Sequence, residues 1–149
     1  MTTKELNVKK AGIALVTFMC SVVLAACSAG NTTEVEINYG SSTIYTQEDM
    51  DAAIQVIQDQ FKTWEGCELH SLTYGSDEAC NVETIAWMND LEDANGADET
   101  FTQCIMFESS FRSPKNGGGA WEPDTEYTWQ WWLARSEGGE WKLMTWGVG

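Results

Sequence analysis

The chain has few basic residues for its length, and this shortage argues against several kinds of function. Its 8 lysines and arginines stand against 23 aspartates and glutamates, which gives a formal net charge of −15. A surface this acidic repels nucleic acid and anionic lipid headgroups, and it favours cations or basic partners. Solubility alone is the simpler explanation of the charge, and both explanations stay open at this point.

Histidine is almost absent, and the residues needed for a metal or cofactor site are missing. His70 is the only histidine, and no two of the five cysteines have the short spacing of a zinc or redox motif. Acidic groups such as Glu92-Asp93 and Asp98-Glu99 lack the alternating oxygen ligands of a calcium loop. The sequence also contains no phosphate-binding loop and no nucleophile elbow. We therefore expect no metal and no cofactor.

Long apolar segments are also lacking, apart from one near the start of the chain. Three lysines within the first ten residues precede an uncharged apolar run from Ala11 to Leu24. This run is shorter than the roughly 20 residues that span a bilayer core. A basic start, an apolar run and small residues before a cleavage site are the order of a secretory signal. Residues 1–26 are therefore predicted to be a signal peptide.

The end of this segment resembles the lipobox of bacterial lipoproteins. Leu24-Ala25-Ala26-Cys27 has leucine three residues before the cysteine and alanines between them, and serine follows. The resemblance implies a diacylglyceryl thioether on Cys27 and cleavage before it. Two acyl chains hold a protein to a membrane far more firmly than one. We expect a protein tethered to the extracytoplasmic face of the cell membrane; the alternative is an ordinary secreted protein with an accidental cysteine.

The mature chain is predicted to be a short stalk followed by one domain. Residues 27–43 are small and polar, which is typical of a flexible stalk, and residues 44–149 would form the domain. Thr46 is placed to cap a helix, with acidic residues in its first turn. Apolar residues then recur at helical spacing as far as Trp64, and Gly66 can close the helix.

The rest of the domain is predicted to be mainly β-structure. Strands are expected over 67–74, 101–111, 125–135 and 140–146, and a shorter helix over 81–94. We therefore expect an α+β fold, in which a long N-terminal helix and a short helix pack on a curved antiparallel sheet of about four strands.

Alternation along the last two strands predicts two apolar faces. The first face, expected to be the core under the long helix, carries Tyr127, Trp129, Trp131, Leu133, Met144 and Trp146. The second face carries Ala134 and a possible binding surface formed by Trp132, Trp141 and Leu143. The short helix, a second copy of the chain in a homodimer, or a stacked ligand could cover this second face.

Three cysteines, Cys67, Cys80 and Cys104, remain for the folded domain. If the strands at 67–74 and 101–111 are antiparallel neighbours, Cys80 approaches Cys104 and Cys67 lies at the far end. A Cys80–Cys104 disulfide is then expected outside the cytoplasm, where disulfides persist. Buried free thiols acting as small apolar side chains are the alternative.

The order of these elements resembles the cystatin-like α+β cone of the nuclear transport factor two superfamily, and more narrowly uncharacterised lipoprotein domains of Gram-positive bacteria. The likeness is carried by 45–49, 61–69, 109–111, 129–135 and 139–147, and it covers most of residues 44–149. It implies a fold more than a function, because one scaffold hosts enzymes, ligand binders and interaction modules.

Enzymes of this superfamily hold acid and base side chains inside the cone. The resemblance makes His70, Tyr74 and Glu108 the candidates, with Trp129 and Trp131 lining the pocket. A lone histidine can act as a general base near neutral pH, although a histidine with no catalytic task is the more common case.

Two classes of function remain. The first is a non-catalytic module that binds an envelope protein, a glycan or a small ligand. The alternative is a small hydrolase or isomerase that uses His70 in the cone pocket. An inward His70 beside a buried carboxylate would favour the enzyme, whereas a filled cone would favour binding.

Overall fold

A five-stranded mixed sheet organises the part of the chain that the structure describes. The computed structural model describes residues 28–149; the predicted signal peptide and Cys27 lie outside them. Along the sheet the strands follow the chain order: β1 (Glu36–Asn38), β2 (Glu68–Tyr74), β3 (Gln103–Arg112), β4 (Glu126–Arg135) and β5 (Lys142–Gly147). Strand β1 runs parallel to β2, and all other neighbours are antiparallel. The α+β class is confirmed, but the sheet has one strand more than expected.

The additional strand comes from the segment predicted to be a flexible stalk, and that prediction was wrong for residues 28–43. In β1, Ile37 lies opposite Leu72 of β2. Nearer the start, the Gly30 amide donates to the Lys62 carbonyl at 3.0 Å and the Asn31 amide donates to the Cys67 carbonyl at 2.8 Å. Main-chain groups at the open edge of β2 thus bind a polar segment that carries few apolar side chains. The composition of the segment gave no sign of this, because ladder hydrogen bonds need no particular side chain.

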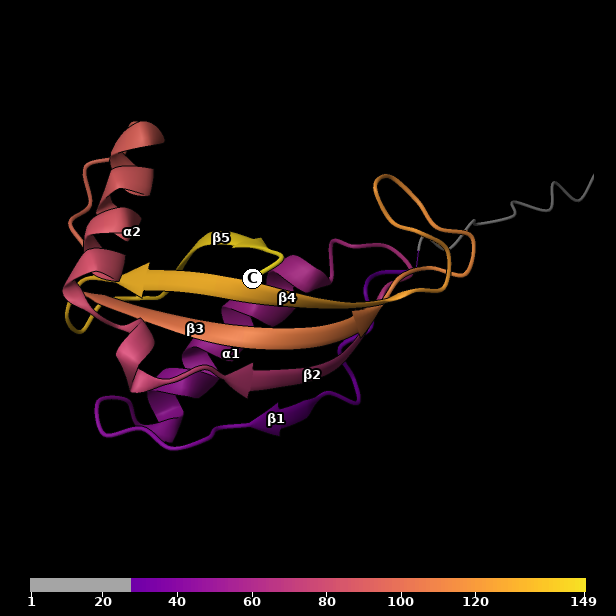
Figure 1. The fold of residues 1–149 in the computed structure, drawn as a ribbon, viewed down its shortest axis with the longest axis horizontal. Helices are drawn as coiled ribbons and strands as arrows, with labels where there is room; N and C mark the ends of the chain where they lie inside the picture. The colour runs from indigo at the N-terminus through magenta and orange to yellow at the C-terminus, as the bar shows by residue number, and fades with distance from the viewer. Residues whose placement is uncertain (1–27) are drawn as a thin grey trace, which may run out of the picture.

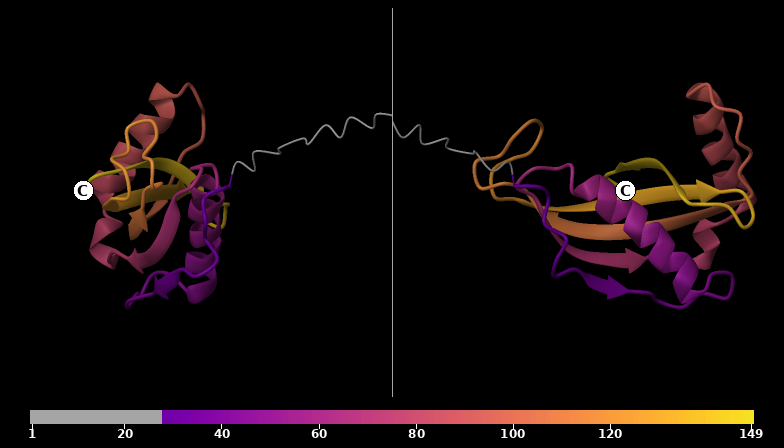
Figure 2. Two further views of the ribbon diagram at one scale, coloured as in Figure 1. Left: turned by 90° about the vertical axis from the view of Figure 1, so that its right-hand side faces the viewer. Right: turned by 180° about the vertical axis from the view of Figure 1, so that it is seen from behind.

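Helix α1 (Gln47–Phe61) crosses one face of the sheet, which we call the inner face (Figure 2). The predicted cap is confirmed: the Thr46 hydroxyl accepts from the Asp49 amide, and the Asp49 carboxylate accepts from the Thr46 amide. The helix buries Met50, Ala53, Ile54, Ile57 and Phe61. It ends at Phe61, earlier than predicted, and Trp64 and Gly66 belong to the turn that follows. Gly66 has a positive φ of 74°, which suits glycine.

A second helix, α2 (Val82–Ala94), packs against the opposite, outer face at one end of the sheet (Figure 1). It follows a 3₁₀ turn, η1 (Asp77–Ala79), and begins at Asn81, whose side chain accepts from the Thr84 amide. A small second core lies beneath the helix and consists of Met88, Phe101, Cys104 and Ala134. We call this the helix end of the sheet. The long β3–β4 loop, residues 113–125, lies at the opposite end, which we call the loop end.

A β-bulge in β5 reverses part of the predicted side-chain alternation. Trp132 pairs with Thr145 but Leu133 pairs with Leu143, so Met144 is an additional residue on β5. Leu143 therefore joins the inner core, and Met144 packs on the outer face against the second core. The predicted assignment of these two residues was wrong because a single inserted residue puts the side chains before the bulge out of phase with those after it.

Asp77 ties the segment before α1 to the end of β2. Its carboxylate accepts hydrogen bonds from the Ser42 hydroxyl at 2.5 Å, the Thr43 amide at 2.7 Å and the Tyr74 hydroxyl at 2.7 Å. These donors, led by the Ser42 hydroxyl, hold the pKa of Asp77 well below its usual range. The charged carboxylate therefore stabilises the fold.

We predict that Asp77 contributes to loss of stability in acid. Because its pKa is lower in the folded chain, its contribution is present above the unfolded value of about 3.9 and is lost as pH falls below it. Asp77→Asn should lower the urea midpoint at pH 7 and should make the midpoint less sensitive to pH between neutrality and acid. If Asp77→Asn lowers the urea midpoint by the same amount at pH 7 and at low pH, relative to the unaltered protein, this role is contradicted.

Candidate functional site

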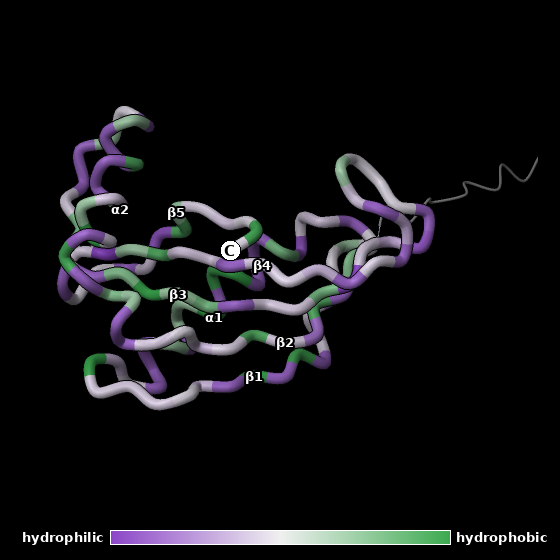
Figure 3. Tube along the Cα trace, in the orientation of Figure 1, coloured by the Kyte–Doolittle hydropathy of each residue, from purple (hydrophilic) through white to green (hydrophobic). Residues whose placement is uncertain are grey.

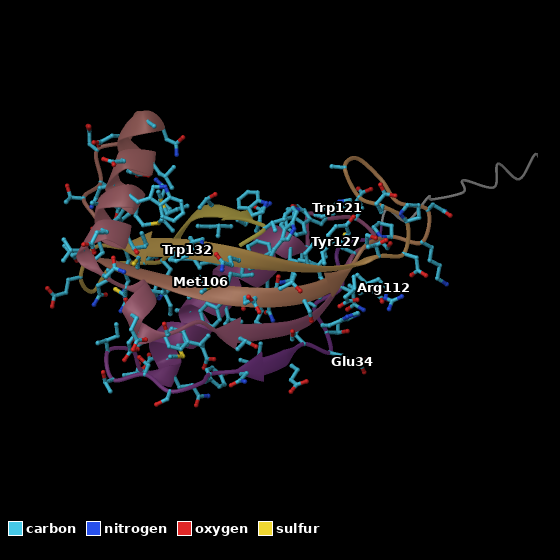
Figure 4. All side chains as sticks on the ribbon, in the orientation of Figure 1. Glu34, Met106, Arg112, Trp121, Tyr127 and Trp132 are labelled. Carbon is cyan, nitrogen blue, oxygen red and sulfur yellow. The ribbon has the colours of Figure 1, made fainter. Side chains whose placement is uncertain are left out.

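An open surface pocket of about 530 Å³ lies at the loop end, between the turn after α1 and the β3–β4 loop. The turn supplies Thr63, Trp64 and Glu65, and the loop supplies Trp121 together with Pro114, Lys115, Asn116 and Gly117–Gly119. We call it the Trp64–Trp121 pocket. Figure 4 shows Trp121 beside Tyr127 at this end of the sheet.

The loop that forms one wall is held by its own hydrogen bonds. The Pro114 carbonyl accepts from the amides of Gly117 and Asp124, each at 2.9 Å, and the Trp121 amide donates to the Gly118 carbonyl at 3.0 Å. Gly117 has a φ of 67°, and a Cβ there would lie 2.8 Å from the Trp121 carbonyl oxygen. A side chain at this position would therefore displace Trp121, so the glycine shapes the pocket.

Behind the pocket lies a cluster of aromatic rings that we call the aromatic cluster. Trp64 is at its centre, stacked on Trp131 with ring centroids 5.1 Å apart and lying 5.4 Å from Trp121. Trp121 in turn lies 4.9 Å from Trp129. The other members are Phe61, Phe111, Tyr127 and Trp146. Rings packed in this way fix one another, so the pocket walls are preorganised for a ligand.

The rim of the pocket combines these rings with polar groups. Lys115 and Asn116 are exposed on the loop, and Glu65 is exposed on the turn. Figure 3 shows hydrophilic residues interspersed along the β3–β4 loop. The Trp129 indole N–H lies in the aromatic cluster behind the pocket, where it is buried without a hydrogen-bond partner among the described residues. Apolar walls with a few polar groups at the rim are the usual composition of a small-molecule site.

The five residues predicted to form a cone pocket do not surround one cavity. Trp129 and Trp131 both pack against Trp64 in the aromatic cluster, and Trp131 is fully buried. Tyr74 is buried at the helix end, where its hydroxyl donates to Asp77. The predicted pocket between helix and sheet is instead filled by side chains: Phe61, Phe107, Phe111 and Trp131 have no exposed surface.

His70 and Glu108 lie elsewhere. The His70 side chain is 41% exposed, and its Nδ1 lies 2.8 Å from the Glu126 carboxylate at the loop end. Glu108 is exposed, and its strand neighbours are Thr73 and Gln130 in the middle of the outer face. The prediction of His70, Tyr74 and Glu108 around one cavity was therefore wrong, because strand register separated them.

The predicted binding surface of Trp132, Trp141 and Leu143 is also divided. Trp132 is half-buried on the outer face, where Trp87 of α2 meets it edge-on at 5.5 Å. Trp141 and Leu143 pack with the inner core, and the Trp141 indole donates to the Asp49 carbonyl at 2.9 Å. The chain itself thus covers the outer face at the helix end, which was one of the three alternatives.

Cys80 and Cys104 lie in contact, as the predicted antiparallel pairing of β2 and β3 requires, and both are free thiols in this structure. The Cys104 amide lies 3.4 Å from the Cys80 sulfur, and the Tyr45 hydroxyl lies 3.1 Å from the same sulfur. Burial and contact with Cys80 raise the pKa of the Cys104 thiol to about 12. Cys67 is buried at the other end of β2.

We predict that an envelope thiol–disulfide oxidoreductase joins Cys80 to Cys104. Half-exposed Cys80 would attack the oxidant's disulfide, and the Cys104 sulfur would then displace the oxidant's thiol, releasing its proton. The closed loop should contribute roughly 3 kcal/mol by restricting the unfolded chain. Peptide mapping of exported protein should find this pair joined and Cys67 free. Three free thiols after export would contradict the pairing.

Neither the structure nor a comparison with known proteins assigns a metal site or a family to the described residues. Within residues 28–149, no group of three or more His, Cys, Asp and Glu is placed to hold a metal ion. In the same part of the chain, no helix is long and apolar enough to cross a membrane. No protein-family model, curated protein or solved structure matches the chain. The resemblance to the nuclear transport factor two superfamily therefore stays a prediction.

Sequence reasoning missed the Trp64–Trp121 pocket. It assigned Trp64 to the long helix, and it gave no role to residues 112–124, which lie between two predicted strands. One feature could have drawn notice: three consecutive glycines lie between Asn116 and Trp121. Consecutive glycines allow close approach of backbone to a ligand, and a tryptophan two residues after the last of them offers a stacking surface.

Proposed function

We propose that the protein is a lipid-anchored, extracytoplasmic binding module whose ligand site is the Trp64–Trp121 pocket. The single observation that carries the proposal is a preorganised pocket with two tryptophans in its walls and a carboxylate, an amide and an ammonium group at its rim. The anchor itself is proposed from the lipobox at Leu24–Cys27.

The shape and chemistry of the pocket favour a glycan. A pyranose ring has an apolar face of C–H groups and a periphery of hydroxyls. The apolar face can stack on an indole ring, and the hydroxyls can form hydrogen bonds with groups such as Asn116 and Glu65. A protein held outside the cell membrane also meets the glycans of the envelope.

A binding role agrees better with the site than a catalytic one does. The only histidine, His70, is engaged by Glu126 on the surface and does not line the pocket. The pocket has one carboxylate, Glu65, whereas glycoside hydrolysis ordinarily uses two carboxyl groups that flank the scissile bond.

Binding should be measured by isothermal titration calorimetry with chitotriose, a soluble trimer of N-acetylated sugar rings. Trp121→Ala should weaken binding about tenfold or more, which corresponds to about 1.4 kcal/mol, because the ring face that stacks on the sugar is removed. Urea unfolding of the same variant establishes whether the domain remains folded.

Trp87→Ala is the matched control. Trp87 is also a partly exposed tryptophan, with 41% of its surface accessible, but it lies on α2 at the helix end. Its replacement should leave chitotriose binding unchanged. No binding by the unaltered protein, or equal effects of the two substitutions, would contradict a glycan site at the pocket.

A further inference from the structure

We infer that the anchor on Cys27 holds the domain directly against the bilayer, with the loop end and its Lys115 at the headgroups and α2 pointing away. The occupant of this surface is the outer leaflet of the membrane that carries the anchor. This inference rests on the proposed lipidation of Cys27, and it adds an orientation that lipidation alone does not specify.

The chain enters the domain at the loop end. The Ser28 carbonyl accepts a hydrogen bond from the Gly66 amide at 2.9 Å. A Cβ on Gly66 would lie 3.2 Å from Pro114, the residue that begins one wall of the pocket. Cys27 is joined directly to Ser28, and consecutive Cα atoms are about 3.8 Å apart. The lipid attachment point is therefore within a few residues' reach of the β3–β4 loop.

No long spacer separates this point from the domain. Residues 28–43, which could have formed a stalk, are bound along the edge of β2 through Asn31 and β1. After cleavage before Cys27, the chain outside the described structure would consist of that one residue. A one-residue connection leaves the domain little freedom to turn its loop end away from the bilayer.

The distribution of charge favours the same orientation. From Asp77 to Glu99 the chain has eight acidic residues and no lysine or arginine, and this segment includes α2 at the helix end. At the loop end, residues 62–68 and 112–126 have three basic residues and five acidic ones, so this end is the less acidic of the two. An anionic membrane surface would repel the helix end most strongly.

The loop end also carries a residue suited to a membrane–water interface. Exposed Lys115, on the β3–β4 loop, has an apolar stem with a charged head. Lysines extend their charge toward water or phosphate from such positions. Figure 1 shows this loop and α2 at opposite ends of the sheet.

The orientation can be tested by the reactivity of the lysines. Purified lipidated protein is placed in vesicles of three parts phosphatidylcholine to one part phosphatidylglycerol and treated with a membrane-impermeant amine reagent. Peptide mass spectrometry then compares Lys115 with Lys142, which lies on β5 at the helix end. Relative to a Cys27→Ala chain in the same mixture, Lys115 should react several-fold more slowly, and Lys142 should be unchanged.

A second variant carries a Gly/Ser spacer of about 20 residues between Cys27 and Ser28, whose mean reach is about 25 Å. This spacer should restore the reactivity of Lys115. Protection that survives the spacer, or equal protection of Lys142, would overturn the orientation. Intact mass distinguishes the failures: no acyl mass on Cys27 contradicts the anchor itself, whereas an acyl mass without Lys115 protection contradicts the orientation alone.

Discussion

Replacing Trp131 with alanine is expected to lower the free energy of unfolding by about 3 to 5 kcal/mol, the usual cost of removing a buried tryptophan. Trp131 has no exposed surface and stacks on both Trp64 and Trp146. Its indole N–H donates to the Ser109 hydroxyl at 2.8 Å, and this buried hydroxyl would lose a partner. Urea denaturation followed by far-UV circular dichroism measures the change.

The neighbouring Trp132→Ala variant is the control for position in the sheet. Trp132 is half-buried and contacts the partly exposed Trp87, so its removal leaves a smaller cavity that water can enter. We expect a loss of about 1 to 2 kcal/mol. If Trp132→Ala lowers the free energy of unfolding as much as Trp131→Ala does, the difference in burial between the two side chains is not what sets their contributions.

Replacing Lys142 with methionine is expected to cost about 3 kcal/mol, because it leaves a buried carboxylate without its partner. Glu92 is fully buried in the last turn of α2, and one of its oxygens lies 2.5 Å from the Lys142 ammonium. The other oxygen is buried without a partner among the described residues. The pair joins α2 to β5, so the loss should appear as weaker docking of α2, measurable by amide hydrogen exchange.

The same substitution in a Glu92→Met background provides the matched comparison. With no carboxylate to neutralise, Lys142→Met should change the free energy of unfolding by less than about 1 kcal/mol. Equal costs in the two backgrounds would show that the lysine acts through packing of its apolar stem, and the buried charge would then not be the cause.

Local patterns in the sequence predicted the two helices well. The beginning of α1 follows from Thr46 and Asp49, whose side chains and backbone bond to each other within one turn. The apolar spacing then indicates which face is buried, and Met50, Ile57 and Phe61 lie on it. Such features depend on residues a few positions apart, so they can be recognised before the fold is known.

Strand positions were predictable, but the faces and the first strand were not. β2 and β4 fall within the predicted ranges and β3 extends one residue beyond its range, whereas β1 consists of Glu36, Ile37 and Asn38, which have no marked β pattern. The bulge at Met144 has no local signature either. Both features depend on which main-chain groups a neighbouring strand leaves free, and that is known only once the strands have paired.

The candidate site depends still more on long-range packing. Trp64 and Trp121 come from segments separated by two strands and a helix, and they meet because the β3–β4 loop folds back onto the turn after α1. His70, chosen for its chemistry alone, lies on the surface beside Glu126. Residue type therefore suggested which side chains could act, but it did not indicate which of them would meet.

The sequence by itself determined the α+β class and the start of α1, because these follow from side-chain periodicity and from short-range hydrogen bonds. Tertiary structure alone decided that residues 28–43 join the sheet, that Leu143 and Met144 exchange faces, and that two distant tryptophans form a pocket. Each of these outcomes depends on strand register and loop docking. Strand register and loop docking depend on many weak contacts between residues far apart in the sequence, so they cannot be predicted from any local pattern.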